Sequence, residues 1–140
     1  MIQRNPATVA QPVANYSHQI EVADTGRWLV LSGQLGQDLA GRTPEDPIEQ
    51  IELALANLGH NLDAAGMEIG HVVKLTIYLV GEIDPARRRA ALDTWLAGHR
   101  PCMTLLYVSA LAAPAFRVEL DAWAHAEQTD PRATPERNPR

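Results

Sequence analysis

The strongest constraint in this sequence is a run near its C-terminal end in which apolar and polar residues alternate. The apolar positions are Phe116, Val118, Leu120, Ala122 and Ala124, and the intervening positions are Arg117, Glu119, Asp121 and Trp123. Because side chains in a β-strand point alternately to opposite faces, this period of two predicts a strand with one apolar and one polar face. Glu119 and Asp121 then lie side by side on the polar face.

A second apolar run, 101–109, comes just before this strand. The residues between the two, 110–115, are small and include Pro114. This link is too short for a helical crossover, so we expect the two strands to form a hairpin or to be near neighbours. Any chemistry should then lie where Glu119 meets the preceding strand.

The first predicted helix has a complete set of start and stop signals. Asp46 is suited to cap it, Pro47 to its first position and Glu49 to a capping box, while Gly66 ends it. Apolar residues recur at steps of three and four. These are Ile48, Ile51, Leu55, Leu58 and Leu62. The stripe must pack on a sheet or another helix.

A second helix is predicted from Asp84 as cap and Pro85 as first residue, through Leu92, Trp95 and Leu96, to Gly98. Its first turns contain three consecutive arginines, 87–89, where the helix dipole disfavours positive charge. Either at least one of them has a carboxylate or ligand partner, or they form a solvated face.

Further strands are expected at 17–23 and 28–32, as a hairpin whose turn uses Gly26, and at 72–80. In the strand expected at 72–80, one face is predicted to carry Val73, Leu75, Ile77 and Leu79. The stretch from Gly33 to Gly36 looks like a strand exit where backbone approaches a ligand closely, although it lacks the features of a phosphate loop.

The order of these elements predicts an α+β domain with both helices on one face of a mixed sheet. We expect a single domain over 1–126, beginning with an extended arm at 1–14, and a disordered tail at 127–140. The other sheet face carries Lys74, Tyr78, Glu119 and Trp123 among apolar neighbours. That face is too apolar to leave in water, so we expect an oligomer.

Composition excludes several classes of function. The net charge is −5 over 140 residues and Lys74 is the only lysine, so there is no basic stripe for nucleic acid. No apolar run approaches the roughly 18 residues that span a bilayer, which favours a cytoplasmic protein without a membrane partner. Cys102 is the single cysteine, so no internal disulfide forms, and we interpret it as a buried thiol.

Few residues suggest chemistry by pattern alone. Glu119 and Asp121 form either a shared acid/base site or a solvated edge with Arg117. Ser32 adjoins Gly33 but lacks a nucleophile elbow, and Tyr16 suits either a pocket or simple packing. The histidines are His18, His60, His71, His99 and His125. Because they show no metal-ligand spacing, we expect neither metal nor cofactor.

Five short segments together resemble the Rid family, also called YjgF or L-PSP. They are Asn15–His18, Leu31–Leu35, Ala64–Met67, Val73–Leu79 and Val118–Ala124. The resemblance implies a chorismate-mutase-like fold of the bacillary type, assembled as a homotrimer with clefts for a small-molecule metabolite between subunits. It also implies hydrolysis of reactive enamine or imine intermediates, such as 2-aminoacrylate, to a keto acid and ammonia.

By this resemblance Glu119 orients the attacking water, with help from Tyr16 and Ser32. The position of the arginine that binds the substrate carboxylate is occupied by Met103, and the usual cysteine two residues later by Leu105. A bidentate arginine–carboxylate pair uses two charged hydrogen bonds, so its loss weakens binding of an α-imino carboxylate by orders of magnitude.

The expected substrate-binding positions are Gly33, Arg89, Met103, Thr104 and Leu105. Arg89 or Arg100 is placed to supply a displaced guanidinium group. One hypothesis is therefore a deaminase-like hydrolase on a different small molecule. The alternative is a non-catalytic trimer that binds a metabolite or a partner protein. Ribonuclease activity, sometimes attributed to the family, fits poorly with the negative charge.

Overall fold

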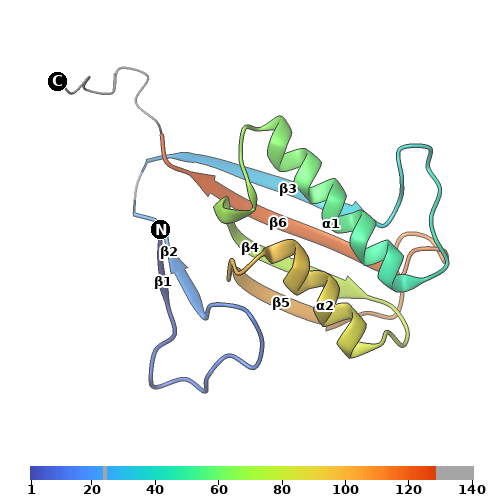
Figure 1. The fold of residues 1–140 in the computed structure, drawn as a ribbon, viewed down its shortest axis with the longest axis horizontal. Helices are drawn as coiled ribbons and strands as arrows, with labels where there is room; N and C mark the ends of the chain where they lie inside the picture. The colour runs from blue at the N-terminus through green and yellow to red at the C-terminus, as the bar shows by residue number, and fades with distance from the viewer. Residues whose placement is uncertain (24, 129–140) are drawn as a thin grey trace, which may run out of the picture.

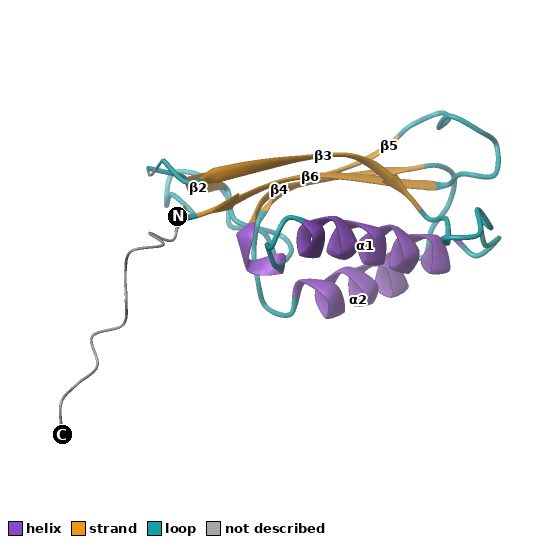
Figure 2. Ribbon diagram, turned by 90° about the horizontal axis from the view of Figure 1, so that it is seen from above, coloured by secondary structure: helices purple, strands orange, loops and turns teal. Residues whose placement is uncertain are grey.

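In the computed structural model, which describes residues 1–23 and 25–128, two helices cover one face of a four-stranded mixed sheet (Figures 1 and 2). The helices are α1 (Pro47–Ala64) and α2 (Pro85–Leu96), and a short 3₁₀ turn, η1 (Ile69–His71), directly precedes strand β4. In spatial order the strands are β3 (Arg27–Leu35), β6 (Val118–Ala126), β4 (Val72–Leu79) and β5 (Cys102–Tyr107). The predicted α+β architecture is confirmed.

The last strand of the chain lies inside the sheet. β6 is antiparallel to both β3 and β4, and β4 is parallel to β5. The hairpin predicted between 101–109 and 116–124 is therefore wrong, because β4 separates β5 from β6, although the strands are near neighbours. Residues 108–117 are long enough to pass the end of one intervening strand, and periodicity within a strand does not report its neighbours.

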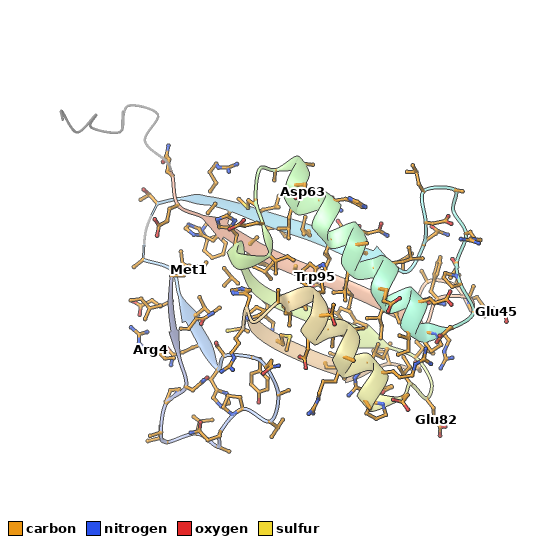
Figure 3. The ribbon with its side chains drawn as sticks, viewed as in Figure 1. Met1, Arg4, Glu45, Asp63, Glu82 and Trp95 are labelled. Carbon is orange, nitrogen blue, oxygen red and sulfur yellow. The ribbon has the colours of Figure 1, made fainter. Side chains whose placement is uncertain are left out.

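The N-terminal segment forms a small sheet of its own beside the main one (Figure 1). β1 (Ile2–Arg4) pairs antiparallel with β2 (Gln19–Glu21), and Arg4, labelled in Figure 3, forms a 2.6 Å ion pair with Glu21. The predicted hairpin of 17–23 with 28–32 is wrong, since β2 pairs with β1 and β3 with β6. Its turn includes Asp24, which lies outside the described residues.

Gly26, the residue that predicts this turn in the sequence, has a different role in the structure. A Cβ at position 26 would collide with the carbonyl oxygen of Ala126 and the ring of His125. The glycine thus allows β3 to begin close against the end of β6, and close backbone approach is the second common reason for a glycine in a strand.

Helix α1 begins where its sequence predicts. The side chain of Asp46 accepts a 3.0 Å hydrogen bond from the backbone N–H of Ile48, and Pro47 is the first helical residue. All members of the predicted stripe are buried: Ile48, Ile51, Leu55, Leu58 and Leu62. Helix α2 likewise begins after Asp84, which accepts from the N–H of Arg87 at 2.8 Å.

Strand β4 departs from its predicted pattern at one position. Leu75, Ile77 and Leu79 face the helices as expected, but Val72 is fully buried and Val73 is only partly buried. An irregularity in the pairing with β6 between Val72 and Lys74 shifts which residues face the core. A strict alternation could not predict this shift.

Three further predictions concern the burial of a cysteine, a membrane span and the C-terminal tail. The prediction that Cys102 is a buried thiol is wrong: it is only partly buried, because it begins the edge strand β5. Among the described residues no helix combines the length and apolar character needed to cross a bilayer. Most of the predicted tail, from residue 129 onward, lies outside the part of the chain that the structure describes.

Candidate active site

Glu119 lies on the sheet face that the helices leave open. Its neighbours Val118 and Leu120 are fully buried, so strand alternation turns Glu119 to the opposite side. In register it lies across from Tyr78 on β4 and Leu35 on β3. The strands that flank Glu119 are therefore β3 and β4, and not the strand expected from the sequence.

A glycine makes room for the Glu119 carboxylate. A Cβ at Gly33 would lie within 2.9 Å of Cγ of Glu119 and closer still to its carboxylate, which side chains essentially do not tolerate. Ser32 is next to this glycine and exposed, at an irregularity in the β3–β6 pairing between Leu31 and Gln34. We call Ser32, Gly33 and Glu119 the acid half-site.

Asp121 follows Glu119 on the same face but has a dedicated partner. The hydroxyl of Tyr78 donates a 3.1 Å hydrogen bond to Oδ2 of Asp121. This hydrogen bond, together with the negative charges of Asp121 and Glu119, raises the pKa of Tyr78 above its ordinary value of 10.0. The tyrosine was not predicted as a site residue, although its position on the mixed face of β4 was.

A second group of predicted residues gathers on the helix side of the sheet, at the β5 edge. Here a cavity of about 240 Å³ is lined by Tyr16, Arg89, Met103 and Leu105. We call these four residues the basic half-site. Its floor is apolar, because Ile77 and Leu92 join the two β5 side chains.

Thr104 does not belong to this group. In the parallel β4–β5 register Met103 is opposite Leu75, and Thr104 is opposite Thr76. Met103 packs against the core cluster, so alternation places Thr104 on the open face, where the ammonium of Lys74 donates to its hydroxyl. Three consecutive predicted positions are thus divided between two faces.

An adjoining cavity of about 420 Å³ contains both arginines that the sequence offered as replacements. Arg89 and Arg100 line it together with Tyr16, Asn15 and Asp93. Within the described part of the chain, neither guanidinium group forms a hydrogen bond or ion pair. Two unpaired positive charges in one cavity favour an anionic ligand.

The two half-sites lie on opposite faces of the sheet within one chain. The acid half-site is on β3 and the inner strand β6 and faces away from the helices, whereas the basic half-site lies at the edge strand β5 beside α2. The predicted site residues therefore do not form one pocket within one chain.

The arginine triplet has three different environments. Arg87 forms a 2.8 Å ion pair with Asp46, which raises the arginine's pKa, so a carboxylate partner for one of the three is confirmed. Arg88 donates to the Tyr107 hydroxyl at 2.9 Å. Arg89 is the member that remains available to a ligand.

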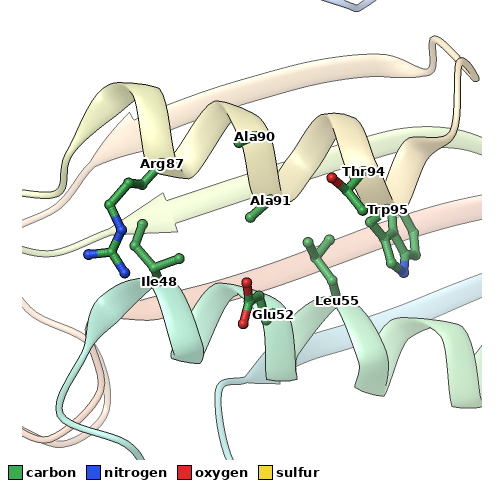
Figure 4. Close-up of a pocket in the computed structure, with 8 residues that line it drawn as sticks. All are labelled: Ile48, Glu52, Leu55, Arg87, Ala90, Ala91, Thr94 and Trp95. Atoms are coloured by element: carbon green, nitrogen blue, oxygen red, sulfur yellow. The ribbon is translucent and has the colours of Figure 1, made fainter.

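Another cavity, of about 530 Å³, lies between α1 and α2 (Figure 4). Arg87 and Trp95 lie at its two ends, and Glu52 projects from α1 between them. None of the predicted site residues lines it. Among residues 1–23 and 25–128, no cluster of three or more potential metal-ligating side chains occurs.

Comparison with known proteins decides the family. The model of the family described as Endoribonuclease L-PSP matches residues 7–126. The chain belongs to the Rid family. The α+β fold is accordingly the chorismate-mutase-like fold of this family.

Two relatives and one solved structure of a Rid protein illustrate the similarity. The chain is 34% identical to Protein DfrA of Myxococcus xanthus over 114 residues, covering 80% of this chain and 86% of the relative. It is 32% identical over 128 residues to 2-iminobutanoate/2-iminopropanoate deaminase of Mus musculus, covering 89% and 92% of the two chains. The crystal structure of the Rid protein YyfB from Yersinia pestis, 30% identical, aligns with a TM-score of 0.80 over 89% of this chain and 98% of that one.

Proposed function

We propose that this Rid-family chain is a cytoplasmic homotrimer that hydrolyses an enamine or imine of a small metabolite in clefts between subunits. The observation that carries the proposal is the division of the candidate residues into two half-sites on opposite faces of the sheet. Each half-site is incomplete alone, and a neighbouring subunit is the simplest way to bring an acid half-site to a basic one. The mouse relative, named as an iminobutanoate and iminopropanoate deaminase, supports the reaction class.

Glu119 is the proposed general base. Its carboxylate accepts a proton from water while the water oxygen bonds to the imine carbon, and this proton passes to the imine nitrogen, which gives a carbinolamine. The same carboxylate then takes the proton of the new hydroxyl group and passes it to the amine, so that the carbonyl forms as the carbon–nitrogen bond breaks and ammonia leaves. Tyr16 and Ser32 position the substrate, and Gly33 keeps the carboxylate in place because no side chain competes for that space.

The substrate is not expected to be standard 2-aminoacrylate. Met103 is partly buried against the core and presents a thioether where a guanidinium would bind the α-carboxylate. A missing charged hydrogen bond costs about 1.5–3 kcal/mol, and a bidentate pair contains two. The net charge of −5 and the single lysine do not support nucleic acid as the substrate.

The open face of the sheet supports assembly. Trp28, Val30 and Trp123 are 51%, 58% and 48% exposed there, and the two tryptophans pack edge to face with ring centroids 6.4 Å apart. Paired exposed aromatic rings in an apolar setting are typical of protein interfaces. A cytoplasmic trimer that covers this face removes it from water.

The experiment that tests the reaction is ammonia release from 2-iminopropanoate, generated in place by an amino-acid oxidase. We expect weak activity in the wild type, loss in Glu119→Gln and a gain in Met103→Arg, which restores an anchor for the carboxylate. Equal rates in wild type and Glu119→Gln would exclude Glu119 as the base. Ammonia release by neither the wild type nor Met103→Arg, with ligand-dependent thermal stabilisation, would favour the non-catalytic binding trimer.

A further inference from the structure

The two cavities beside α2 adjoin each other along a shared wall and differ in their chemistry. Six residues line both cavities: Val13, Ala14, Asn15, Tyr16, Arg89 and Asp93. One end is floored by apolar side chains of Ile77, Leu92, Met103 and Leu105. The other end contains Arg100. We call the whole space the composite cavity.

Within the described chain Arg89 has no ion-pair partner, although a carboxylate lies nearby on α2. Arg89 and Asp93 are four residues apart on the helix, the spacing at which an arginine and an aspartate ordinarily pair. No ion pair between them occurs among the described residues, and Oδ1 of Asp93 accepts a 3.0 Å hydrogen bond from the side-chain amide of Asn15. The N-terminal segment thus occupies part of the carboxylate that Arg89 could otherwise use.

Arg100 is held through its backbone. Its carbonyl oxygen accepts hydrogen bonds from the Ser17 hydroxyl at 2.7 Å and from the Gln3 side chain at 3.2 Å. The next carbonyl, of Pro101, accepts from the Ser17 N–H at 3.1 Å. These bonds fix the Cα of Arg100 at the cavity wall while its side chain remains without a partner in the described chain.

The charge of the composite cavity is positive on balance. Arg88, Arg89 and Arg100 line it against the single carboxylate of Asp93. Arg88 is already held by the Tyr107 hydroxyl, so the two other arginines are the available donors. Paired guanidinium groups bind a carboxylate through several charge-assisted hydrogen bonds.

We propose that the composite cavity binds an amphipathic monocarboxylate, with its hydrocarbon body on Met103 and Leu105 and its carboxylate between Arg89 and Arg100. The identification of this ligand as substrate rests on the proposed function, whereas its binding does not. Met103, at the family's usual anchor position, is part of the apolar floor, and the positive charges that stay unpaired there, among the described residues, are those of Arg89 on α2 and of Arg100, two residues before β5. The metabolite then differs from 2-aminoacrylate by a larger apolar body.

The test is calorimetric titration of the full chain at low salt with hexanoate, and with hexylamine, hexanol and acetate as comparators. Hexanoate is expected to bind at least about tenfold more tightly than each comparator, because only it satisfies both ends. Arg89→Leu and Arg100→Leu are each expected to weaken hexanoate by about tenfold or more. Arg42→Leu, the same change at a guanidinium whose side chain is 83% exposed in a distant loop, is the control and should bind as the wild type does.

Asn15→Ala provides an independent check. Without the Asn15 amide, Asp93 is free to pair with Arg89, so hexanoate should bind several-fold more weakly although no arginine has changed. Equal binding of hexanol and hexanoate would overturn the charge argument, and equal binding of acetate would overturn the apolar one. No hexanoate binding, or unchanged binding in Arg89→Leu and Arg100→Leu, would overturn the proposal.

Failure of this inference can be told apart from failure of the proposed function. Glu119→Gln should lose ammonia release and keep hexanoate affinity. Turnover that depends on Glu119, without hexanoate binding, leaves the hydrolase standing and removes the composite cavity as its substrate site. Hexanoate binding together with turnover that does not depend on Glu119 would leave the composite cavity standing as a ligand site and would remove Glu119 as the base of the proposed hydrolase.

Discussion

The carboxylate of Glu119 lies directly over the α-carbon of Gly33, in the space that any other residue's Cβ would fill. β6 carries the acid and β3 carries the glycine, and the two strands come from opposite ends of the chain. The position of the proposed base is therefore determined by a residue that itself contributes no side chain.

Gly33→Ala is expected to displace the Glu119 side chain and to lower ammonia release by about a hundredfold, since a misplacement of about 1 Å costs that much in a positioned site. The measurement is kcat, with the melting temperature as a check on folding. Gly59→Ala is the matched control. Its nearest neighbour would be Nε1 of Trp95 at 3.9 Å, so activity should persist and the helix should gain about 0.5–1 kcal/mol.

A buried side-chain amide on α1 joins two loops and gives a prediction about stability. Nε2 of Gln50 donates to the carbonyl oxygens of Pro44 at 2.7 Å and Ala115 at 3.0 Å, and its Oε1 accepts from the N–H of Arg117 at 2.9 Å. Gln50→Met keeps the shape and leaves these groups unpaired, at about 1–3 kcal/mol each.

We expect Gln50→Met to lower the free energy of unfolding in urea by at least about 3 kcal/mol in total. The exposed Asn61, on the same helix, is the control, and Asn61→Leu should change it by less than about 1 kcal/mol. A loss in Gln50→Met no larger than in the control would show that the three backbone groups find other partners.

The helices could be predicted because their signals are local. Asp46, Pro47 and the stripe from Ile48 to Leu62 specify a start, a direction and a buried face within one segment. Gln50 is the exception, since a polar residue next to the stripe gives no sign that it is buried. Its partners lie in loops that only the finished fold brings near.

The neighbours of each strand could not be predicted in the same way. Alternation assigned Glu119 to its face correctly, but β6 pairs with β3 and β4 and not with the adjacent β5. The same limitation separates Met103 from Thr104, because the resemblance named consecutive positions whereas a strand sends them to opposite faces. Pairing depends on packing across the whole domain, which no single segment encodes.

Asp46 predicts how stability depends on pH. The N–H of Ile48 and then the guanidinium of Arg87 hold the pKa of Asp46 below its ordinary value of 3.8. A depressed pKa in the folded state stabilises the protein above the unfolded value, and this contribution is lost as pH falls through the folded value. Asp46→Asn keeps a capping side chain and removes the charge.

The variant Asp46→Asn should therefore be less stable than wild type at pH 5–8, with a difference that shrinks below about pH 4 and vanishes once Asp46 is protonated in both states. Urea unfolding across this pH range measures it. A difference that stays constant into acid would show that the charge of Asp46 is not its cause.

The open sheet face gives the prediction on which the intersubunit site depends. Trp123→Asp places a charge beside Trp28, and desolvating an unpaired charge at an interface is costly, so we expect light scattering to report trimers for wild type and monomers for the variant. The monomer should stay folded, because Trp123 is 48% exposed and lies outside the core. Leu39→Asp, at a fully exposed residue in the loop before α1, should remain trimeric.

If the two half-sites work only across subunits, Trp123→Asp must lose ammonia release together with assembly. A folded monomer with wild-type turnover would place the whole reaction within one chain.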